Sequence, residues 1–362
     1  MKALIAMSGG VDSAVAALLT AGAGYECAGC TMRLYGGDNV PDAQNRGCCT
    51  ADDAEDARSV AYRLGMPHYT FNYTDCFRAD VIGRFVDCYL RGETPNPCID
   101  CNRRLKFGAL MDRAREIGCD CLVTGHYARI TEENGTYYLK KAADPGKDQS
   151  YVLYMLTQEQ LAHLRFPLGE LSKAQVRKIA REHGFINADK PDSQDICFVP
   201  DGNYAGVIEG LTGRESVPGE FVDPDGKALG RHQGIIRYTV GQRRGLGLSW
   251  HEPLYVVRID PEKNQVVLGP KEALFSKTLT AGEFHWIAGE PAPGATVRCA
   301  VKTRYRQTEQ PATAAPLGDG RVRVEFDAPQ RAVTPGQSAV LYDGDTVLGG
   351  GVILRETEEG NL

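Results

Sequence analysis

From Met1 to about Cys121 the chain alternates short apolar runs with longer amphipathic stretches of helix-forming residues. The first run, Leu4–Met7, has no polar alternation, which indicates a strand buried on both faces. Strands and helices that alternate in this way are typical of a parallel sheet covered by helices, so we predict an α/β domain with ligands at the carboxyl ends of its strands. Besides a helix after Ser13, we expect strands at Tyr25–Met32, His68–Tyr73 and Asp120–Thr124, and helices at Asp52–Leu64, Asp75–Leu90 and Arg103–Ile117.

The segment 144–203 is interpreted as a smaller helical insertion. Ser172 is a typical N-cap for the run SKAQVRKIAREHG, which ends at Gly184. On this helix Lys173, Arg177 and Arg181 recur every fourth residue, so we expect one basic stripe along it.

From about Asn203 onward, short apolar runs alternate with proline and glycine turns such as Pro335-Gly336. This pattern predicts all-β structure, in the form of two small barrels with a boundary near Ala273–Thr280. The expected organisation is an α/β domain at 1–203 that includes the insertion, a small β domain at 204–275 and a C-terminal β-barrel at 276–362. Strands are expected at Gly234–Val240, Leu254–Ile259, Gln265–Leu268, Thr296–Val301, Val322–Phe326 and Ser338–Tyr342.

The chain has 362 residues and a formal net charge of −6. No apolar stretch approaches the roughly 18 residues of a membrane-spanning helix, and no basic segment precedes the short apolar run at the N-terminus. We therefore expect a cytoplasmic protein without membrane contact. The acidic balance argues against a purely electrostatic binder of nucleic acid, so contact with RNA must come from local basic faces.

The first predicted strand and helix are joined by SGGVDS, Ser8–Ser13. Its glycines permit close backbone approach, and the N–H groups at a helix N-terminus favour phosphate. The chain contains neither a Walker loop (G-x-x-x-x-G-K-S/T) nor a G-x-G-x-x-G fingerprint. The loop resembles that of the ATP pyrophosphatases, which activate a carbonyl oxygen by adenylation; the alternative is an ordinary glycine turn.

The 12 cysteines are too dilute for a disulfide scaffold. Cys98 and Cys101 lie in TPNPCIDCN, Thr94–Asn102, where we expect two prolines to exclude a helix and fix an extended loop before a basic helix. Cations and a helix N-terminus lower the pKa of nearby thiols. With Cys197, in another predicted loop, these form either a sulfur-carrying trio or structural cysteines. Cys27, Cys30, Cys119 and Cys121 are expected in the core, Cys76 and Cys88 carry no signal, and Cys48 and Cys49 are unassigned.

Five motifs, SGGVDS, TPNPCIDCN, TGHYAR, KDQSYVLY and DSQDICF, resemble those of the tRNA-uridine 2-sulfurtransferases, the MnmA/TrmU family. Gly47–Thr50, Asp53–Arg58 and HQGIIRYTVGQRRGLG add to a resemblance that covers nearly the whole chain. It implies ATP-dependent 2-thiolation of the wobble uridine in the anticodon stem-loop of tRNA. The C2 oxygen is adenylated, and sulfur from a cysteine persulfide then replaces it, with release of AMP and pyrophosphate.

The resemblance also implies the site residues. Cys197 would carry the persulfide, supplied by a cysteine desulfurase or a sulfur-relay protein, and Cys101 would attack it and leave a disulfide. Mg²⁺ would neutralise the pyrophosphate. ATP would contact Ala6, Met7, Ser8, Gly9, Gly10, Val11, Asp12, Ser13, Met32 and Gly125; the flipped target base would contact Asn96, Pro97 and Cys98; and tRNA would contact His126, Lys147, Asp148, Gln149, Arg304, Tyr305 and Gln337.

Position 98 departs from the pattern of many family members, which carry Asp there as an acid or base. With cysteine at this position, the proton-transfer role is left without an assigned residue. The three thiols Cys98, Cys101 and Cys197 also resemble the three-cysteine iron–sulfur site of related tRNA thiolases. A 4Fe-4S cluster on these thiols is therefore an alternative route for the same reaction.

Two basic clusters are candidates for phosphate contact. Arg298, Lys302, Arg304 and Arg306 share strand parity, so one strand face would carry four cations opposite Tyr305. We predict that Arg304→Ala weakens tRNA binding and flattens its salt dependence. A lone histidine is more often structural, but His126 in the TGH motif favours contact with RNA or the active site. The second cluster is Arg231, Arg237, Arg243 and Arg244 in the central domain.

Two other functions are open from the residues alone. An amide-forming ATP pyrophosphatase that acts on a small molecule would need neither the cysteine trio nor the basic β domains, and tRNA-dependent release of AMP would reject it. A non-enzymatic RNA-binding module would have no use for SGGVDS, and a lack of ATP affinity would identify it.

Overall fold

The computed structural model describes residues 1–34, 51–191, 196–199, 202–292 and 294–355. Gly47–Thr50, with Cys48 and Cys49, and the Asp192–Asp195 part of the DSQDICF motif lie outside the described residues. Within the described ranges, no helix is long and apolar enough to cross a membrane. The chain divides into two units: Met1–Ile82, Pro97–Gly202 and Asp345–Val347 form the first, and Gly83–Asn96, Asn203–Gly344 and Leu348–Leu362 form the second.

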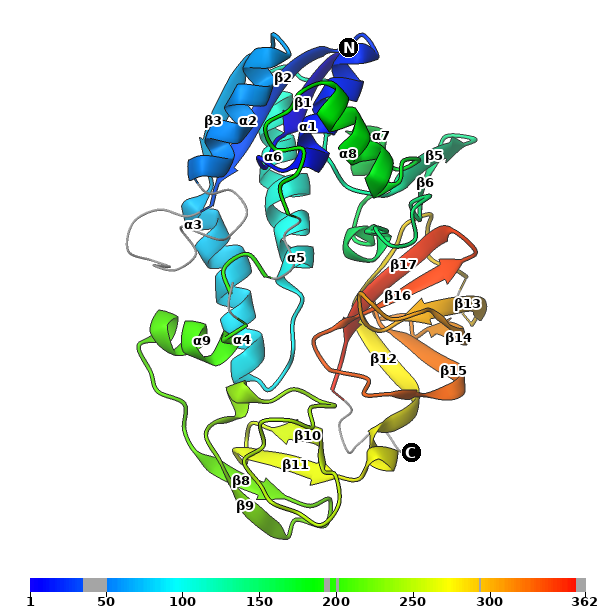
Figure 1. Ribbon diagram of the computed structural model, residues 1–362. Coiled ribbons are helices and arrows are strands. Elements are labelled where there is room, and N and C mark those ends of the chain that lie inside the picture. Colours follow the sequence, from blue (N-terminus) through cyan, green and yellow to red (C-terminus); the bar gives the residue numbers. More distant parts are fainter. Residues whose placement is uncertain (35–50, 192–195, 200–201, 293, 356–362) are drawn as a thin grey trace. The chain divides into compact units, whose positions relative to one another are not determined.

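The first unit is built on a parallel sheet with the strand order β3-β2-β1-β4-β7. Figure 1 shows β3, β2 and β1 side by side. In β1 (Lys2–Ala6), Leu4 and its two neighbours have no solvent exposure, which confirms a strand buried on both faces. A further strand, β7, was not predicted, because two residues are too few to show a pattern. The remaining strands are β2 (Glu26–Arg33), β3 (His68–Asn72), β4 (Cys121–Val123) and β7 (Leu164–Arg165).

Helices α1 (Val11–Gly22), α2 (Ala51–Arg63) and α8 (Lys173–Glu182) share one apolar cluster with β1. The β1 members of this cluster, Ala3 and Ile5, have the same strand parity, so these helices cover one face of the sheet. A further helix, α6 (Leu110–Glu116), packs against β4. This arrangement confirms the predicted α/β architecture.

The cysteine-bearing segment is helical from Pro97 onward, so the extended loop predicted through Asn102 is wrong beyond Asn96. Proline is well accepted at the first position of a helix, because its missing N–H would have no partner there. The predicted helix Asp75–Leu90 is one helical run with a π-helical middle. The pieces are α3 (Thr74–Phe77), a π-helical turn (Arg78–Gly83), α4 (Arg84–Leu90), α5 (Pro97–Asp100), a second π-helical stretch (Cys101–Ala109) and α6.

Between β4 and α8 the first unit contains a hairpin that was not predicted. Its turn has positive φ at both Asn134 (52°) and Gly135 (80°), and an Asn-Gly pair is the local signal that would have identified it. The Ser172 side chain accepts from the Gln175 N–H in a capping box, which confirms the predicted start of α8. These elements are β5 (Arg129–Glu133), β6 (Thr136–Lys140), a 3-10 turn (Ser150–Leu153) and α7 (Gln158–Ala162).

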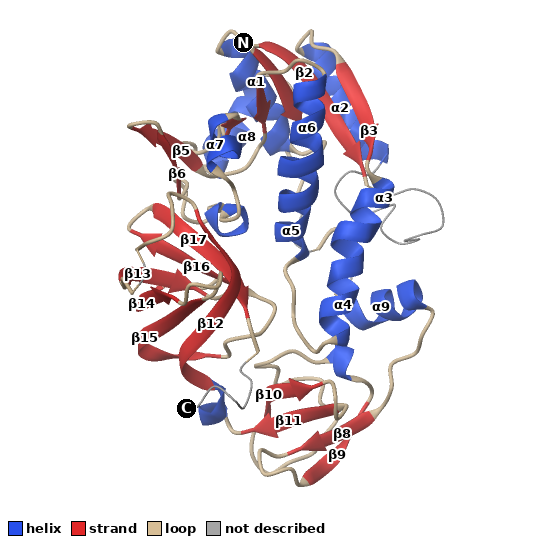
Figure 2. Ribbon diagram, turned by 180° about the vertical axis from the view of Figure 1, so that it is seen from behind, coloured by secondary structure: helices blue, strands red, loops and turns tan. Residues whose placement is uncertain are grey.

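In the second unit, six strands form a closed barrel in the order β12-β15-β14-β13-β16-β17, completed by pairing of β12 with β17. Its core includes Val324, Phe326 and Leu341. The predicted C-terminal barrel is therefore confirmed (Figure 2). The strands are β12 (Phe275–Trp286), β13 (Val297–Lys302), β14 (Gln310–Pro316), β15 (Val322–Arg331), β16 (Ser338–Asp343) and β17 (Thr346–Ile353).

The central part of the second unit is a sheet in the order β10-β11-β8-β9, with Phe221 and Val256 in its core. Two predictions are wrong here. Gly234–Val240 forms a 3-10 turn (Ile235–Arg237) rather than a strand, and α9 (Tyr204–Thr212) is a helix where only strands were expected. The Asn203 side chain caps α9, a local signal that outweighs the β-like composition. The strands are β8 (Gly219–Val222), β9 (Ala228–His232), β10 (Tyr255–Asp260) and β11 (Gln265–Gly269).

Candidate functional site

The loop between β1 and α1 is bent tightly at the carboxyl edge of the parallel sheet. Gly9 has φ of +75°, and a Cβ atom on it would lie 2.3 Å from the carbonyl oxygen of Asp53. The Ser13 hydroxyl accepts from the Ser8 N–H (3.2 Å) and donates to the Gly10 carbonyl (3.0 Å). The predicted strand, glycine turn and helix N-terminus are therefore confirmed, and the turn accepts only glycine at position 9.

Gly125 lies directly against the start of α1. A Cβ atom on it would lie 2.8 Å from the Asp12 carbonyl carbon and from the Ser13 nitrogen. β4, which precedes Gly125, pairs with β1, and on the other side of β1 lies β2, which carries the buried Met32. The structure thus places Gly125 against the SGGVDS loop where the strand order reverses, which is where open α/β sheets bind ligands. Met32 lies near the carboxyl end of the neighbouring strand.

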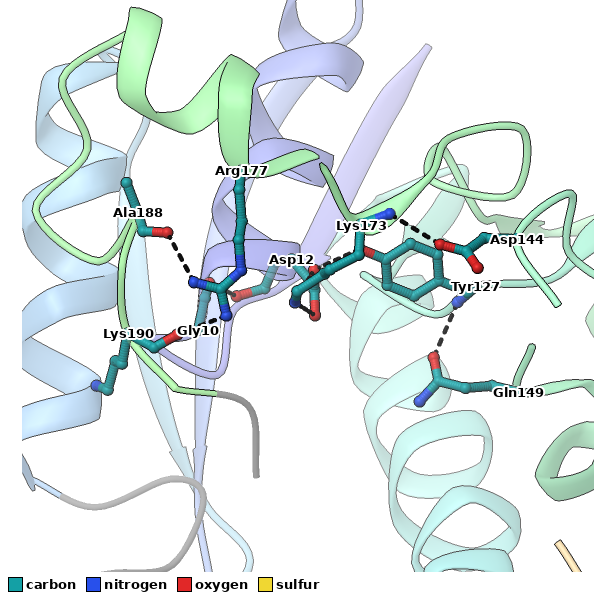
Figure 3. A network of polar contacts seen from close by, with 10 residues as sticks. Gly10, Asp12, Tyr127, Asp144, Gln149, Lys173, Arg177, Ala188 and Lys190 are labelled. Carbon is teal, nitrogen blue, oxygen red and sulfur yellow. Dashed lines mark hydrogen bonds and ion pairs between the residues drawn. The ribbon is translucent and has the colours of Figure 1, made fainter. Parts of the chain in front are cut away.

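Asp12 is held by two side chains from distant parts of the first unit (Figure 3). The Lys173 ammonium lies 2.8 Å from each carboxylate oxygen, and the Tyr127 hydroxyl donates to Oδ1 (2.7 Å). Tyr127 in turn donates its N–H to the Gln149 side chain (2.9 Å). The sequence reasoning included Asp12 and Gln149 but missed the roles of Tyr127 and Lys173. The TGHYAR motif and the basic stripe were the signals that pointed to them.

The chain segment after α8 is also tied to the loop. The buried Asn187 amide donates to the Gly9 carbonyl (2.9 Å), and Arg177 donates to the carbonyl of Lys190 (3.2 Å). The Lys190 ammonium lies 2.6 Å from carboxylate oxygens of both Asp53 and Asp56 on α2. The stripe residues Lys173 and Arg177 are thus used within the first unit, and the contacts of this paragraph hold the chain after α8, as far as Lys190, against the SGGVDS loop and α2.

Cys98 and Cys101 lie one helical turn apart, Cys98 exposed and Cys101 half-buried. Cys197 is half-buried and precedes Phe198, whose buried ring meets Phe77 edge-on at 5.8 Å between centroids. Among the described residues, no three His, Cys, Asp or Glu side chains are grouped closely enough to hold a metal ion. The three thiols do not form a ready cluster site in this conformation, so we assign no step to a cluster.

The strand cysteines have a different environment from the helical pair. Cys30 and Cys121 are buried, as expected of core residues, whereas Cys27 and Cys119 are only partly buried. Burial raises the pKa of all four thiols above the usual range. Because the thiolate is the nucleophile, this environment disfavours sulfur chemistry at these positions.

His126 is a buried residue, only 8% exposed. Its ring packs beside Phe107 and Phe166, and its Nδ1 lies 2.7 Å from the Thr124 hydroxyl. Burial, with a smaller contribution from Lys106, holds the pKa of His126 well below its usual value, so the imidazole is neutral. This environment suits a structural histidine, and the expected contact of His126 with tRNA stays a prediction.

Lys147, Asp148 and Gln149 are half-buried. Asp148 Oδ1 accepts from the N–H groups of Ala142 (3.0 Å) and Ser150 (3.2 Å). These bonds give Asp148 a role in the loop itself, and tRNA contact by the triplet stays a prediction.

The basic face expected along one strand of the barrel is only partly formed. β13 ends at Lys302, so Arg304 and Arg306 lie in a turn and the parity argument does not hold for them. The turn forms because Thr303 donates twice to the Gln307 side chain (2.7 and 2.9 Å). Acidic partners also offset the strand charges: Arg298 pairs with Asp327 (2.5 Å) and Lys302 with Glu309 (3.8 Å). In the central cluster, Arg237 pairs with Glu209 (2.7 Å), whereas Arg231, Arg243 and Arg244 are exposed.

Two of the expected tRNA contacts in the second unit make internal bonds. One Arg304 nitrogen donates to the Val240 and Ala332 carbonyls and to the Thr334 hydroxyl (3.1, 3.0 and 2.6 Å). The Gln337 amide donates to the carbonyl of Thr94 (2.7 Å), two residues before Asn96. Tyr305, by contrast, is exposed. The loop at 332–337 is therefore connected both to Arg304 and to the segment that leads into the cysteine helix.

Comparison with known proteins places three family profiles along the chain: the tRNA methyl transferase HUP domain at 1–201, the tRNA methyl transferase PRC-barrel domain at 209–270 and the aminomethyltransferase beta-barrel domain at 276–353. The tRNA-specific 2-thiouridylase MnmA of Acetivibrio thermocellus is 50% identical to this chain, over an aligned region that covers 97% of this chain and 99% of the relative's length. The protein of the same name from Moorella thermoacetica is 49% identical, and the aligned region covers 97% of this chain and 98% of the relative's length. A solved 4-thiouridine synthetase–RNA complex with bound ATP matches 55% of this chain and 45% of its own at 19% identity, with a TM-score of 0.37, too low to compare the folds.

Proposed function

This chain belongs to the tRNA-specific 2-thiouridylase family, and from this premise we propose that it converts the wobble uridine of tRNA to 2-thiouridine. The observation that carries the proposal is the SGGVDS loop, which aims the N-terminus of α1 and the glycine backbone at one point beside Gly125. That geometry suits a polyphosphate. The net reaction consumes ATP and protein-borne sulfur and releases AMP and pyrophosphate.

In the first step the C2 oxygen of uridine attacks the α-phosphorus of ATP, which enters as its Mg²⁺ complex. The backbone and hydroxyls of Ala6–Ser13 bind the phosphates, and the developing charge of the pyrophosphate faces the positive end of α1. Gly125 and Met32 line the adenine side. Attachment of AMP converts a poor leaving group into a good one.

In the second step sulfur replaces the activated oxygen. Cys197 carries a persulfide loaded by a cysteine desulfurase or a relay protein. Cys101 attacks its inner sulfur, the released hydrosulfide attacks C2, and AMP leaves, so a Cys101–Cys197 disulfide remains to be reduced. Asn96, Pro97 and Cys98 hold the flipped uridine.

The three-domain division proposed above assigns catalysis to 1–203, a linking β domain to 204–275 and tRNA binding to the barrel at 276–362. Exposed Tyr305 and the exposed arginines Arg243 and Arg244 are suited to contact tRNA. We place the reaction in the cytoplasm. The other proposed tRNA contacts are His126, Lys147, Asp148, Gln149, Arg304 and Gln337.

The test is thiolation of unmodified tRNA by protein purified without oxygen, with iron measured in the same samples. We expect iron-free protein to be active, Cys197→Ser to abolish sulfur loading, and Cys101→Ser to load sulfur without transferring it. Activity that requires reconstituted iron bound through Cys98, Cys101 and Cys197 would replace the persulfide route by the cluster route. AMP release without tRNA would instead indicate a small-molecule substrate.

A further inference from the structure

The SGGVDS loop contains one charged residue, and its charge has the wrong sign for a phosphate site. Asp12 is the second residue of α1. A carboxylate there competes with a phosphate for the positive end of the helix and repels it. An anion site built around Asp12 therefore needs a compensating cation.

Lys173, which is 161 residues from Asp12 in the sequence, supplies this cation. Its ammonium is equidistant, at 2.8 Å, from both Asp12 oxygens, and its side chain is only 13% exposed. The same ammonium lies 6.0 Å from the centroid of the Tyr127 ring, whose hydroxyl also donates to Asp12. A lysine that is mostly withdrawn from water and bound to both oxygens is held far more firmly than an exposed surface pair.

The position of Lys173 is set by its helix. It is the first residue of α8, just after the Ser172 capping box, and its N–H donates to the Asp144 carboxylate (3.0 Å). One turn later Arg177 binds the carbonyls of Ala188 and Lys190. The start of α8 is thus anchored on both sides while Lys173 reaches the loop.

We propose that Lys173 is a positioning residue that neutralises Asp12 and thereby makes the SGGVDS loop an anion site. The inference rests on the proposed function, in which this loop binds the phosphates of ATP. Once its charge is neutralised, Asp12 links α1 to α8 and to the Tyr127 segment through its contacts with Lys173 and Tyr127, and it does not repel the nucleotide. Lys173 acts through Asp12, and its effect should therefore vanish when Asp12 carries no charge.

The experiment is a double-mutant cycle on ATP affinity, measured by calorimetry on the full-length protein without tRNA. The buffer contains EDTA, so that the dissociation constant is that of ATP without a bound metal ion. We expect Lys173→Met to weaken ATP binding by about tenfold or more, because it leaves Asp12 uncompensated. In an Asp12→Asn background the same substitution should change affinity by less than about threefold. Lys173→Arg should retain most of the affinity.

Lys178→Met is the matched control, since Lys178 is on the same helix, its side chain is 74% exposed and it pairs only with Glu182 among the described residues. It should bind ATP as the wild type does, and thermal unfolding checks that each variant is folded. If Lys173→Met lowers ATP affinity equally in both backgrounds, Lys173 contacts the nucleotide directly and the proposal is overturned. The proposal is also overturned if Lys173→Met lowers ATP affinity in neither background. Wild-type protein that binds ATP neither in EDTA nor in the presence of Mg²⁺ would instead refute the proposed function.

Discussion

Arg304 is both a positively charged candidate for tRNA contact and a hydrogen-bond donor that connects two segments of the second unit. One nitrogen of its guanidinium serves three oxygen acceptors: the Val240 and Ala332 carbonyls and the Thr334 hydroxyl. Val240 belongs to the central part of the second unit, and the other two belong to the loop that precedes β16. The residue therefore orders a loop that is itself a candidate tRNA contact.

Arg304→Ala should weaken tRNA binding, flatten its salt dependence and lower stability, because buried acceptors lose their donor. The loss of unfolding free energy should be about 1–3 kcal/mol. Arg304→Lys should restore most of the salt slope, which depends on charge, but not all of the stability, since the shorter lysine side chain does not place its ammonium where the guanidinium nitrogen meets its three acceptors. Filter binding across a salt series and urea unfolding measure the two effects. An unchanged salt slope for Arg304→Ala would contradict a phosphate contact.

At the scale of elements, the helix that carries Cys98 and Cys101 begins at Pro97. The segment before this helix is hydrogen-bonded to the barrel loop at 334–337. The Thr94 N–H donates to the Pro335 carbonyl (2.9 Å), and Gln337 donates to the Thr94 carbonyl. Gly336 has φ of +88°, and a Cβ atom on it would lie 2.9 Å from the Thr94 nitrogen. The loop at 334–337 thus holds the chain that enters the proposed base pocket.

We predict that Gln337→Ala slows thiolation more than it weakens tRNA binding, because the Thr94 carbonyl loses its donor and Asn96 loses its fixed approach. The single-turnover rate with saturating tRNA should fall about tenfold while the dissociation constant changes less than about threefold. Gln310→Ala is the control, because within the described part of the chain the Gln310 side-chain amide donates only locally, to the Thr308 carbonyl. A loss confined to tRNA affinity would show instead that Gln337 acts as a direct tRNA contact.

At the scale of the whole molecule, both units contain buried histidines whose neutral form is favoured. Burial lowers the pKa of His126 in the first unit and of His232 in the second, and partial burial lowers that of His68 in the first unit, with nearby cations contributing less. A histidine whose pKa is lower in the folded state binds fewer protons there than in the unfolded chain. Its contribution to stability is therefore present above the unfolded value of about 6.5 and is lost as the pH falls below it.

We expect the free energy of unfolding to decrease between pH 7.5 and pH 5.5, with His126 as a main contributor because its pKa is lowered most clearly. Urea unfolding at the two pH values measures this change. In His126→Asn the decrease should be smaller than in the wild type, whatever the variant's stability at pH 7.5. His183→Gln, which alters an exposed histidine at the end of α8, should keep the full decrease. An identical decrease in His126→Asn would refute the assignment.

Local signals were sufficient for most of the fold. The Leu4–Met7 run, the SGGVDS turn and the Ser172 cap were recognised because strand burial, glycine turns and helix caps depend on residues close in sequence. Errors occurred where a local rule had an exception or a signal was weak. Pro97 starts a helix instead of excluding one, and Asn203 caps a helix inside a stretch of β-like composition.

The sequence by itself therefore determined the α/β domain, the C-terminal barrel, the phosphate-loop geometry and the residues that carry the family resemblance. Only the tertiary structure decided which side chains meet. Lys173 reaches Asp12 across 161 residues, and Gln337 reaches Thr94 across 243. It also showed that His126 is buried and that Arg304 bonds within its own unit. Periodicity describes a face of a helix or strand, whereas the partner of that face depends on how distant elements pack, which no local pattern encodes.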